Sequence, residues 1–108
     1  YRRVAALADL WNTHNNVGLV VGATGPEELE AIREAVPSLP FLVPGVGAQG
    51  GDAEAAVEYG LRDDGVGVVN SSRGIIYAGE NAGKEFAAAA GQSAKRLKRR
   101  LNQYRGDY

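Results

Sequence analysis

The chain contains no cysteine and no methionine among its 108 residues. Without cysteine, disulfide bonds and thiolate metal sites are excluded, and the redox compartment stays open. No apolar run approaches the roughly 18 residues of a membrane-spanning helix, and the first residues lack the pattern of a signal peptide. The net charge of −1 offers no bulk attraction to nucleic acid or to an anionic membrane. We therefore expect an intracellular, cytoplasmic protein without nucleic-acid or membrane partners.

The lack of methionine, with Tyr1 as the first residue, indicates a piece of a longer protein rather than a primary translation product. Hydrophobic residues make up 44% of the chain and charged residues 23%, which is close to the average for globular domains. A length of 108 residues corresponds to one domain or less. We therefore expect a single partial domain over 1–108.

Apolar runs alternate with helical patterns along the chain. Three apolar runs are expected as strands: 17–23, 41–43 and 65–70. The first is continuous and rich in β-branched residues, so we expect it to be buried on both faces. Four segments have the spacing or the end signals of helices: 2–13, about 26–36, about 53–60 and about 82–104, with a short turn near 75–78. This α/β alternation with short connections predicts parallel strands and right-handed crossovers.

Two architectures fit this order, a doubly wound sheet and the last three β/α units of a (β/α)₈ barrel. A complete barrel needs about 250 residues, so three units would leave an open sheet edge and half of an apolar interior exposed. Another chain or a missing segment would cover those surfaces. Helix faces expected toward the core are Val4, Leu7, Ala8 and Trp11 in the first helix, Leu29, Ile32 and Val36 in the second, and Phe86, Ala90, Ala94, Leu97 and Leu101 in the last.

Two loops rich in glycine and serine follow the last two expected strands. The first, PGVGAQGGD at 44–52, holds four glycines and Gln49, and the second, NSSRG at 70–74, holds Arg73. Bare backbone N–H groups cradle an anion, and a guanidinium binds two of its oxygens at once. In barrels of this class the phosphate site is typically built from the loops after the last two strands. The pattern predicts a site for a phosphate ester.

Each candidate residue also has a purely structural interpretation. Arg73 fits a surface arginine at a strand end, and Gln49 can satisfy backbone groups within its own loop. Thr24 and Asp52 both stand where they can cap a helix. The last helix and the residues before it carry seven of the twelve basic residues, which is more typical of a solvated outer face than of a nucleic-acid or membrane surface.

Three strings together resemble the carboxy-terminal portion of orotidine 5′-phosphate decarboxylases, above all the longer bacterial subfamily: VGLVVGAT at 17–24, FLVPGVGAQGGD at 41–52 and GVGVVNSSRGIIYA at 65–78. The resemblance implies a (β/α)₈ barrel in which these strands are the sixth, seventh and eighth. It implies a lyase that converts orotidine monophosphate (OMP) to uridine monophosphate (UMP) and CO₂ in pyrimidine biosynthesis. It also implies a cytoplasmic homodimer that needs no metal or organic cofactor.

The same resemblance assigns roles to individual residues. Arg73 would make the main charged contact with the substrate phosphate, and Gln49 would contact the phosphate and the pyrimidine edge. Backbone N–H groups near Gly50 and Gly74 would complete the site. Four further residues are expected to line the substrate site: Thr24, Pro44, Gly47 and Ser72.

The chain departs from the family in its lysines. The family carries an Asp-x-Lys-x-x-Asp motif in the first half of the barrel, whereas this chain has only Lys84, Lys95 and Lys98 and no such motif. We therefore expect no catalytic residue here and no activity from this chain without the missing amino-terminal part of the barrel. Two alternatives remain: a self-associating phosphate- or nucleotide-binding fragment, and another barrel enzyme acting on sugar phosphates. The loop around Gln49 argues against the latter.

Overall fold

A computed structural model describes residues 2–22, 25–46, 53–80 and 85–105 of the chain. Its elements in chain order are α1 (Arg2–Trp11), β1 (Leu19–Val20), α2 (Pro26–Ala35), β2 (Phe41–Val43), α3 (Ala53–Glu58), β3 (Val68–Val69), α4 (Ser72–Ile76) and α5 (Phe86–Arg105). The strands form one parallel sheet in the order β1-β2-β3. The predicted β/α alternation is confirmed, although β1 and β3 are shorter than the apolar runs that contain them.

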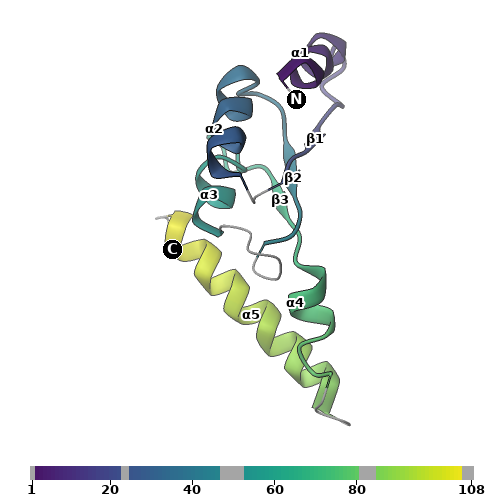
Figure 1. The fold of residues 1–108 in the computed structure, drawn as a ribbon, viewed down its shortest axis with the longest axis vertical. Helices are drawn as coiled ribbons and strands as arrows, with labels where there is room; N and C mark the ends of the chain where they lie inside the picture. The colour runs from purple at the N-terminus through teal and green to yellow at the C-terminus, as the bar shows by residue number, and fades with distance from the viewer. Residues whose placement is uncertain (1, 23–24, 47–52, 81–84, 106–108) are drawn as a thin grey trace.

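Among the described residues, the helices cover one face of this sheet. In Figure 1, α2, α3 and the carboxy-terminal end of α5 lie on one side of β2 and β3, and α1 lies near β1. The core between these layers joins Leu29 of α2, which is completely buried, to Phe41 and Val43 of β2. Burying each such side chain stabilises the fold by about 1.5–3 kcal/mol. The predicted core face of α2 is confirmed, since Leu29, Ile32 and Val36 are all buried.

The other face of the sheet is apolar and open. Val20 of β1 is paired with Leu42 of β2, which is paired in turn with Val68 of β3. Neighbouring partners in a sheet point to the same face, so these three side chains form one row across it. They are 70%, 37% and 60% exposed, respectively. The expectation that the first strand is buried on both faces is therefore wrong for this chain, and the row has the character of an uncovered barrel interior.

The contacts of α1 differ from those predicted. Ala5 and Ala8 are buried, whereas Val4, Leu7 and Trp11 are exposed by 64%, 38% and 66%. Helix α1 packs against α2, and small alanine side chains allow a close approach. Helical spacing correctly located an apolar helix, but it could not show which apolar side chains another element covers.

The carboxy-terminal part of the chain also corrects two expectations. The short turn expected near 75–78 is a helix that begins earlier, at Ser72, and ends at Ile76. In α5, Leu97 and Leu101 pack against the core as predicted, but Phe86 is 61% exposed because the beginning of α5 lies beyond the sheet.

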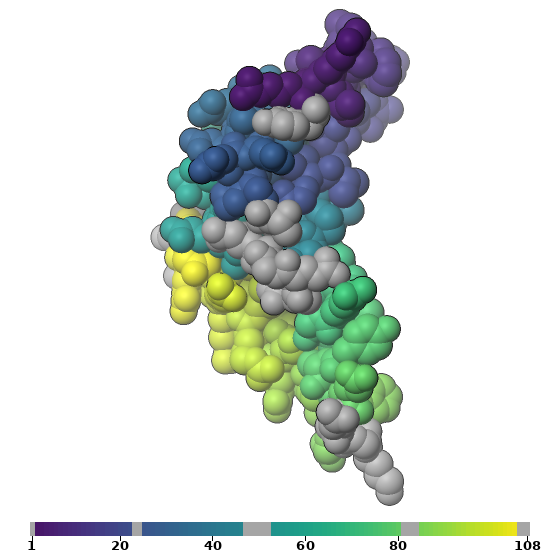
Figure 2. All heavy atoms as spheres, in the orientation of Figure 1, coloured from purple at the N-terminus to yellow at the C-terminus, as the bar shows by residue number. Residues whose placement is uncertain are grey.

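The molecule is elongated. Its extents are 49 × 26 × 26 Å, and its radius of gyration is 15.3 Å. A compact domain of this length would have a radius of gyration of about 13 Å. Figure 2 shows the end formed by α4 and the start of α5 projecting from the body. None of the helices within the described ranges is long and apolar enough to cross a membrane.

Candidate phosphate-binding site

The two predicted phosphate loops start side by side. Strands β2 and β3 are parallel, so both end at the same edge of the sheet. Beyond the strands, the backbone N–H of Asn70 donates to the carbonyl of Val43 at 2.9 Å, and the N–H of Val46 donates to the carbonyl of Asn70 at 3.3 Å. These two hydrogen bonds hold segment 44–46 of the first loop against the start of the second.

Gly45 gives the first loop its direction. Its φ of 76° lies in the left-handed region, where a residue with a side chain costs roughly 1–2 kcal/mol. This turn follows the half-buried Pro44 and brings Val46 into the core, where its side chain is fully buried. A glycine at this position therefore lets the chain leave β2 and still pair with Asn70.

The second loop leads directly into α4. Ser71 is extended, with φ −136° and ψ 92°, and it precedes the first residue of the helix. The side-chain amide of Asn70 donates to the hydroxyl of Ser72 at 3.0 Å. Arg73 lies in the first turn of α4 and is exposed. Its guanidinium makes no hydrogen bond or ion pair with any of the described residues.

Gly74 connects α4 to α5. Its carbonyl accepts a hydrogen bond of 2.6 Å from the hydroxyl of Ser93. The structure thus places Pro44, Ser72, Arg73 and Gly74 in the two adjoining segments. Four other predicted site residues, Thr24, Gly47, Gln49 and Gly50, lie outside the described residues, as does the expected cap Asp52.

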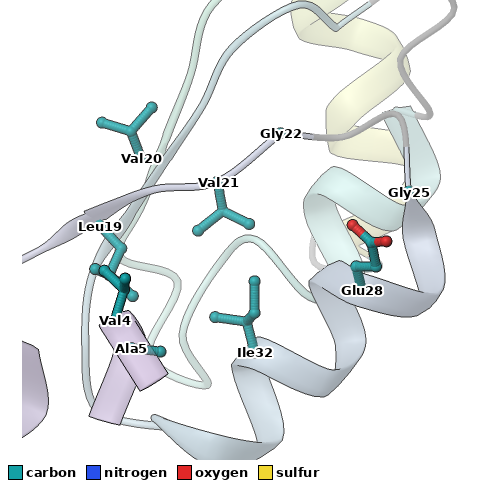
Figure 3. A pocket seen from close by; sticks show the side chains of 9 residues that line it. All are labelled: Val4, Ala5, Leu19, Val20, Val21, Gly22, Gly25, Glu28 and Ile32. Carbon is teal, nitrogen blue, oxygen red and sulfur yellow. The ribbon is translucent and has the colours of Figure 1, made fainter. Parts of the chain in front are cut away.

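A separate cavity of about 330 Å³ lies between α1, β1 and the start of α2 (Figure 3). Its walls include the apolar side chains of Val4, Val21 and Ile32, and the carboxylate of Glu28 is on its border. A carboxylate repels a phosphate, so this cavity does not suit an anion. It lies beside β1, one of the two edge strands of the sheet. Across the described parts of the chain, no group of three or more His, Cys, Asp or Glu side chains could hold a metal ion.

Arg33, which is not among the predicted site residues, fixes the start of β2. From the last turn of α2 its guanidinium donates to five backbone carbonyls, those of Val36, Pro37, Leu39, Tyr59 and Gly60. Burial lowers the pKa of Arg33, and the nearby charge of Arg62 lowers it further. A basic residue in the last turn of a helix is a known signal for binding carbonyls, but it does not identify carbonyls 26 and 27 residues away.

Parallel β/α units with one covered face, one open apolar face and two joined loops at the strand ends define part of a (β/α)₈ barrel. The chain is 71% identical over 112 residues to orotidine 5′-phosphate decarboxylase of Haloarcula marismortui, with 97% of this chain and 40% of that protein covered. It is 48% identical to the decarboxylase of Dehalococcoides mccartyi over 97% of this chain and 38% of that one. The resemblance to orotidine 5′-phosphate decarboxylase is therefore confirmed, and the chain spans about 40% of the length of these curated relatives.

Solved structures agree with this assignment. OMP decarboxylase of Leishmania donovani matches with a TM-score of 0.73 and 41% identity, covering 97% of this chain and 38% of that one. UMP synthase of the same organism matches with a TM-score of 0.69 and 42% identity, covering 91% of this chain and 21% of that one. No protein-family model matches the chain.

Proposed function

We propose that this chain supplies the phosphate-binding part of an orotidine 5′-phosphate decarboxylase, which converts OMP to UMP and CO₂. The observation that carries the proposal is the hydrogen-bonded pairing of segment 44–46 with Asn70, followed at once by the exposed residue Arg73. The names of the relatives supply the reaction.

The chemistry explains why the remainder of the barrel is needed. When the carboxylate leaves as CO₂, its bonding electron pair stays on the pyrimidine carbon, which then takes up a proton. Preorganised positive charge beside that carbon stabilises the developing carbanion. Lys95 and Lys98 lie on α5, Lys84 lies outside the described residues, and no Asp-x-Lys-x-x-Asp motif is present. In this proposal the charge therefore comes from outside the chain. The chain alone is expected to be inactive.

Arg73 would act on the reaction from a distance. Binding energy gained at a remote phosphate can orient the ring and close the site around it. In this proposal Gln49 and the backbone N–H groups near Gly50 and Gly74 complete the phosphate site, and Thr24, Pro44, Gly47 and Ser72 line it. The resemblance also implies that the complete enzyme is a cytoplasmic homodimer that uses no cofactor, and these points belong to the same proposal.

A chimeric enzyme tests the proposal directly. The Haloarcula marismortui decarboxylase would have its matching segment replaced by this chain, with the rest of the protein unchanged. Release of CO₂ and formation of UMP from OMP would then be measured under conditions in which the unaltered relative is active. We expect activity within about tenfold of the parent. A folded chimera without decarboxylase activity would contradict the proposed function.

A second candidate is a self-associating fragment that binds phosphate or a nucleotide without catalysis. The open row of Val20, Leu42 and Val68 favours it, because exposed apolar surface of this kind is normally covered by another polypeptide. The two candidates differ in what covers that row, the rest of the barrel or a second copy of this chain.

A further inference from the structure

Another cavity, of about 280 Å³, lies between α4, the residue that precedes it and the middle of α5. It is lined by Ser71, Gly74, Ser93, Arg96, Leu97 and Arg100. Arg73 does not line it, and only Gly74 is shared with the proposed phosphate site. The cavity therefore has its own set of polar groups.

The charges around this cavity are positive. Arg96 and Arg100 are four residues apart on α5, so they lie one above the other on the same face of the helix. No carboxylate lines the cavity, and neither guanidinium has a recorded ion pair or hydrogen bond within the described ranges. Two like charges one turn apart destabilise a helix slightly unless an anion joins them.

The two serines at the cavity have different roles. The hydroxyl of Ser93 donates its one hydrogen to the carbonyl of Gly74, which fixes α4 against α5 and leaves Ser93 no proton to offer a ligand. Ser71 is only 9% exposed, and its side chain does not cap α4. The residue is nearly buried, but its hydroxyl makes no such bond and borders the cavity, so it is available to donate to a bound group.

We infer that this cavity binds a phosphate-class oxyanion at a site separate from Arg73. Guanidinium groups have five N–H donors and no acceptor, and Ser71 adds a hydroxyl donor, so the set is suited to an anion with several oxygens. A bound anion would join Ser71, just before α4, to Arg96 and Arg100 on α5. It would thereby hold in place the short helix that carries Arg73.

The test is a titration of the ¹⁵N-labelled chain with inorganic phosphate, at an ionic strength held constant with NaCl. We expect saturable shifts of the amide signals of Ser71, Gly74 and Ser93. The Arg96→Gln/Arg100→Gln variant should bind phosphate at this site at least about tenfold more weakly, since it loses two charge-assisted contacts. The matched control is Lys95→Gln/Arg99→Gln, which removes the same charge at the same spacing on α5 but outside the cavity lining.

A third variant separates this site from the proposed function. Arg73→Gln should leave the saturable shifts at Ser71 and Ser93 unchanged. The inference is overturned if wild-type shifts rise linearly without saturation, or if both double variants weaken binding equally. It is also overturned if Arg73→Gln alone abolishes the shifts, which would assign them to the site of the proposed decarboxylase. Loss of activity in the chimeric enzyme would not affect this result.

Discussion

The guanidinium of Arg33 lies over the ring of Phe41, with 3.7 Å between Cζ and the ring centroid. Arg33 lies in the last turn of α2, and Phe41 begins β2 and is 2% exposed. The cation thus contacts the aromatic face while its N–H groups donate to backbone carbonyls around the same junction. This pair fixes the angle at which the chain enters the central strand, from which the first phosphate loop departs.

Replacing Arg33 with lysine should destabilise the chain although the charge is kept. Lysine has three donors on one atom and no planar fork, so several of the five carbonyls would lose their partner. We expect a loss of about 2 kcal/mol in the free energy of unfolding, measured by urea denaturation. Arg99→Lys on the exposed side of α5 is the control and should change stability by less than about 0.5 kcal/mol. Equal effects would rule out the role assigned to Arg33.

The hydrogen bond from Arg62 should make stability depend on pH through Asp64. Two guanidinium N–H groups of Arg62 donate to this carboxylate at 2.6 and 3.1 Å, and together with the N–H of Val66 they lower the pKa of Asp64. A lowered folded-state pKa stabilises the fold fully above the ordinary value of 3.8, and this contribution is lost as pH falls through the folded pKa.

Asp64→Asn should therefore be less stable than the wild type at pH 6, and the difference should shrink below about pH 4. Urea midpoints across this range measure it. Arg62→Gln should remove the same pH-dependent stabilisation, since it deletes the hydrogen bonds between the two residues from the arginine side. A difference that stays constant from pH 6 to pH 3 would show that the ion pair does not supply it.

Local signals in the sequence predicted much of the fold. Pro26 with two acidic residues after it located the start of α2, and strand 41–43 was predicted to the residue. Residues whose role depends on distant partners were not predictable in this way. Phe86 has helical spacing but is 61% exposed, and Arg33 gains its role from carbonyls brought near by folding. In the candidate site, the close approach of the two loops was predictable, because parallel strands end at the same edge of the sheet.

Gly45→Ala should loosen the link between the two loops. Alanine at a φ of 76° is strained by roughly 1–2 kcal/mol, so the free energy of unfolding should fall by about that amount. Gly91→Ala is a matched control on α5, where an added methyl group meets nothing within 4 Å. In this helix interior it should instead stabilise the chain by about 0.5–1 kcal/mol. Both would be measured by urea denaturation, and a neutral Gly45→Ala would disprove the strained turn.

Arg73→Ala should lower the kcat/KM of the chimeric enzyme for OMP. A charge-assisted contact with phosphate is worth about 1.5–3 kcal/mol, which corresponds to a loss of about ten- to a hundredfold in kcat/KM. Arg99→Ala is the control, because it removes the same kind of charge from an exposed position on α5. It should leave kcat/KM within about twofold of the unaltered chimera. Kinetics of Arg73→Ala that match those of Arg99→Ala would remove Arg73 from the site.

The open sheet face should drive association of the isolated chain. Val20 and Val68 project from the same face and are 70% and 60% exposed, so pairing two copies over this row would bury apolar surface. Val20→Thr/Val68→Thr keeps their shape but adds two hydroxyls that must be desolvated, and it should raise the dissociation constant at least about tenfold in sedimentation velocity. Val4→Thr/Val66→Thr makes the same change at exposed positions outside the row and should have little effect. A wild-type chain that stays monomeric at all concentrations would instead leave this face for the rest of the barrel and disfavour the self-associating fragment.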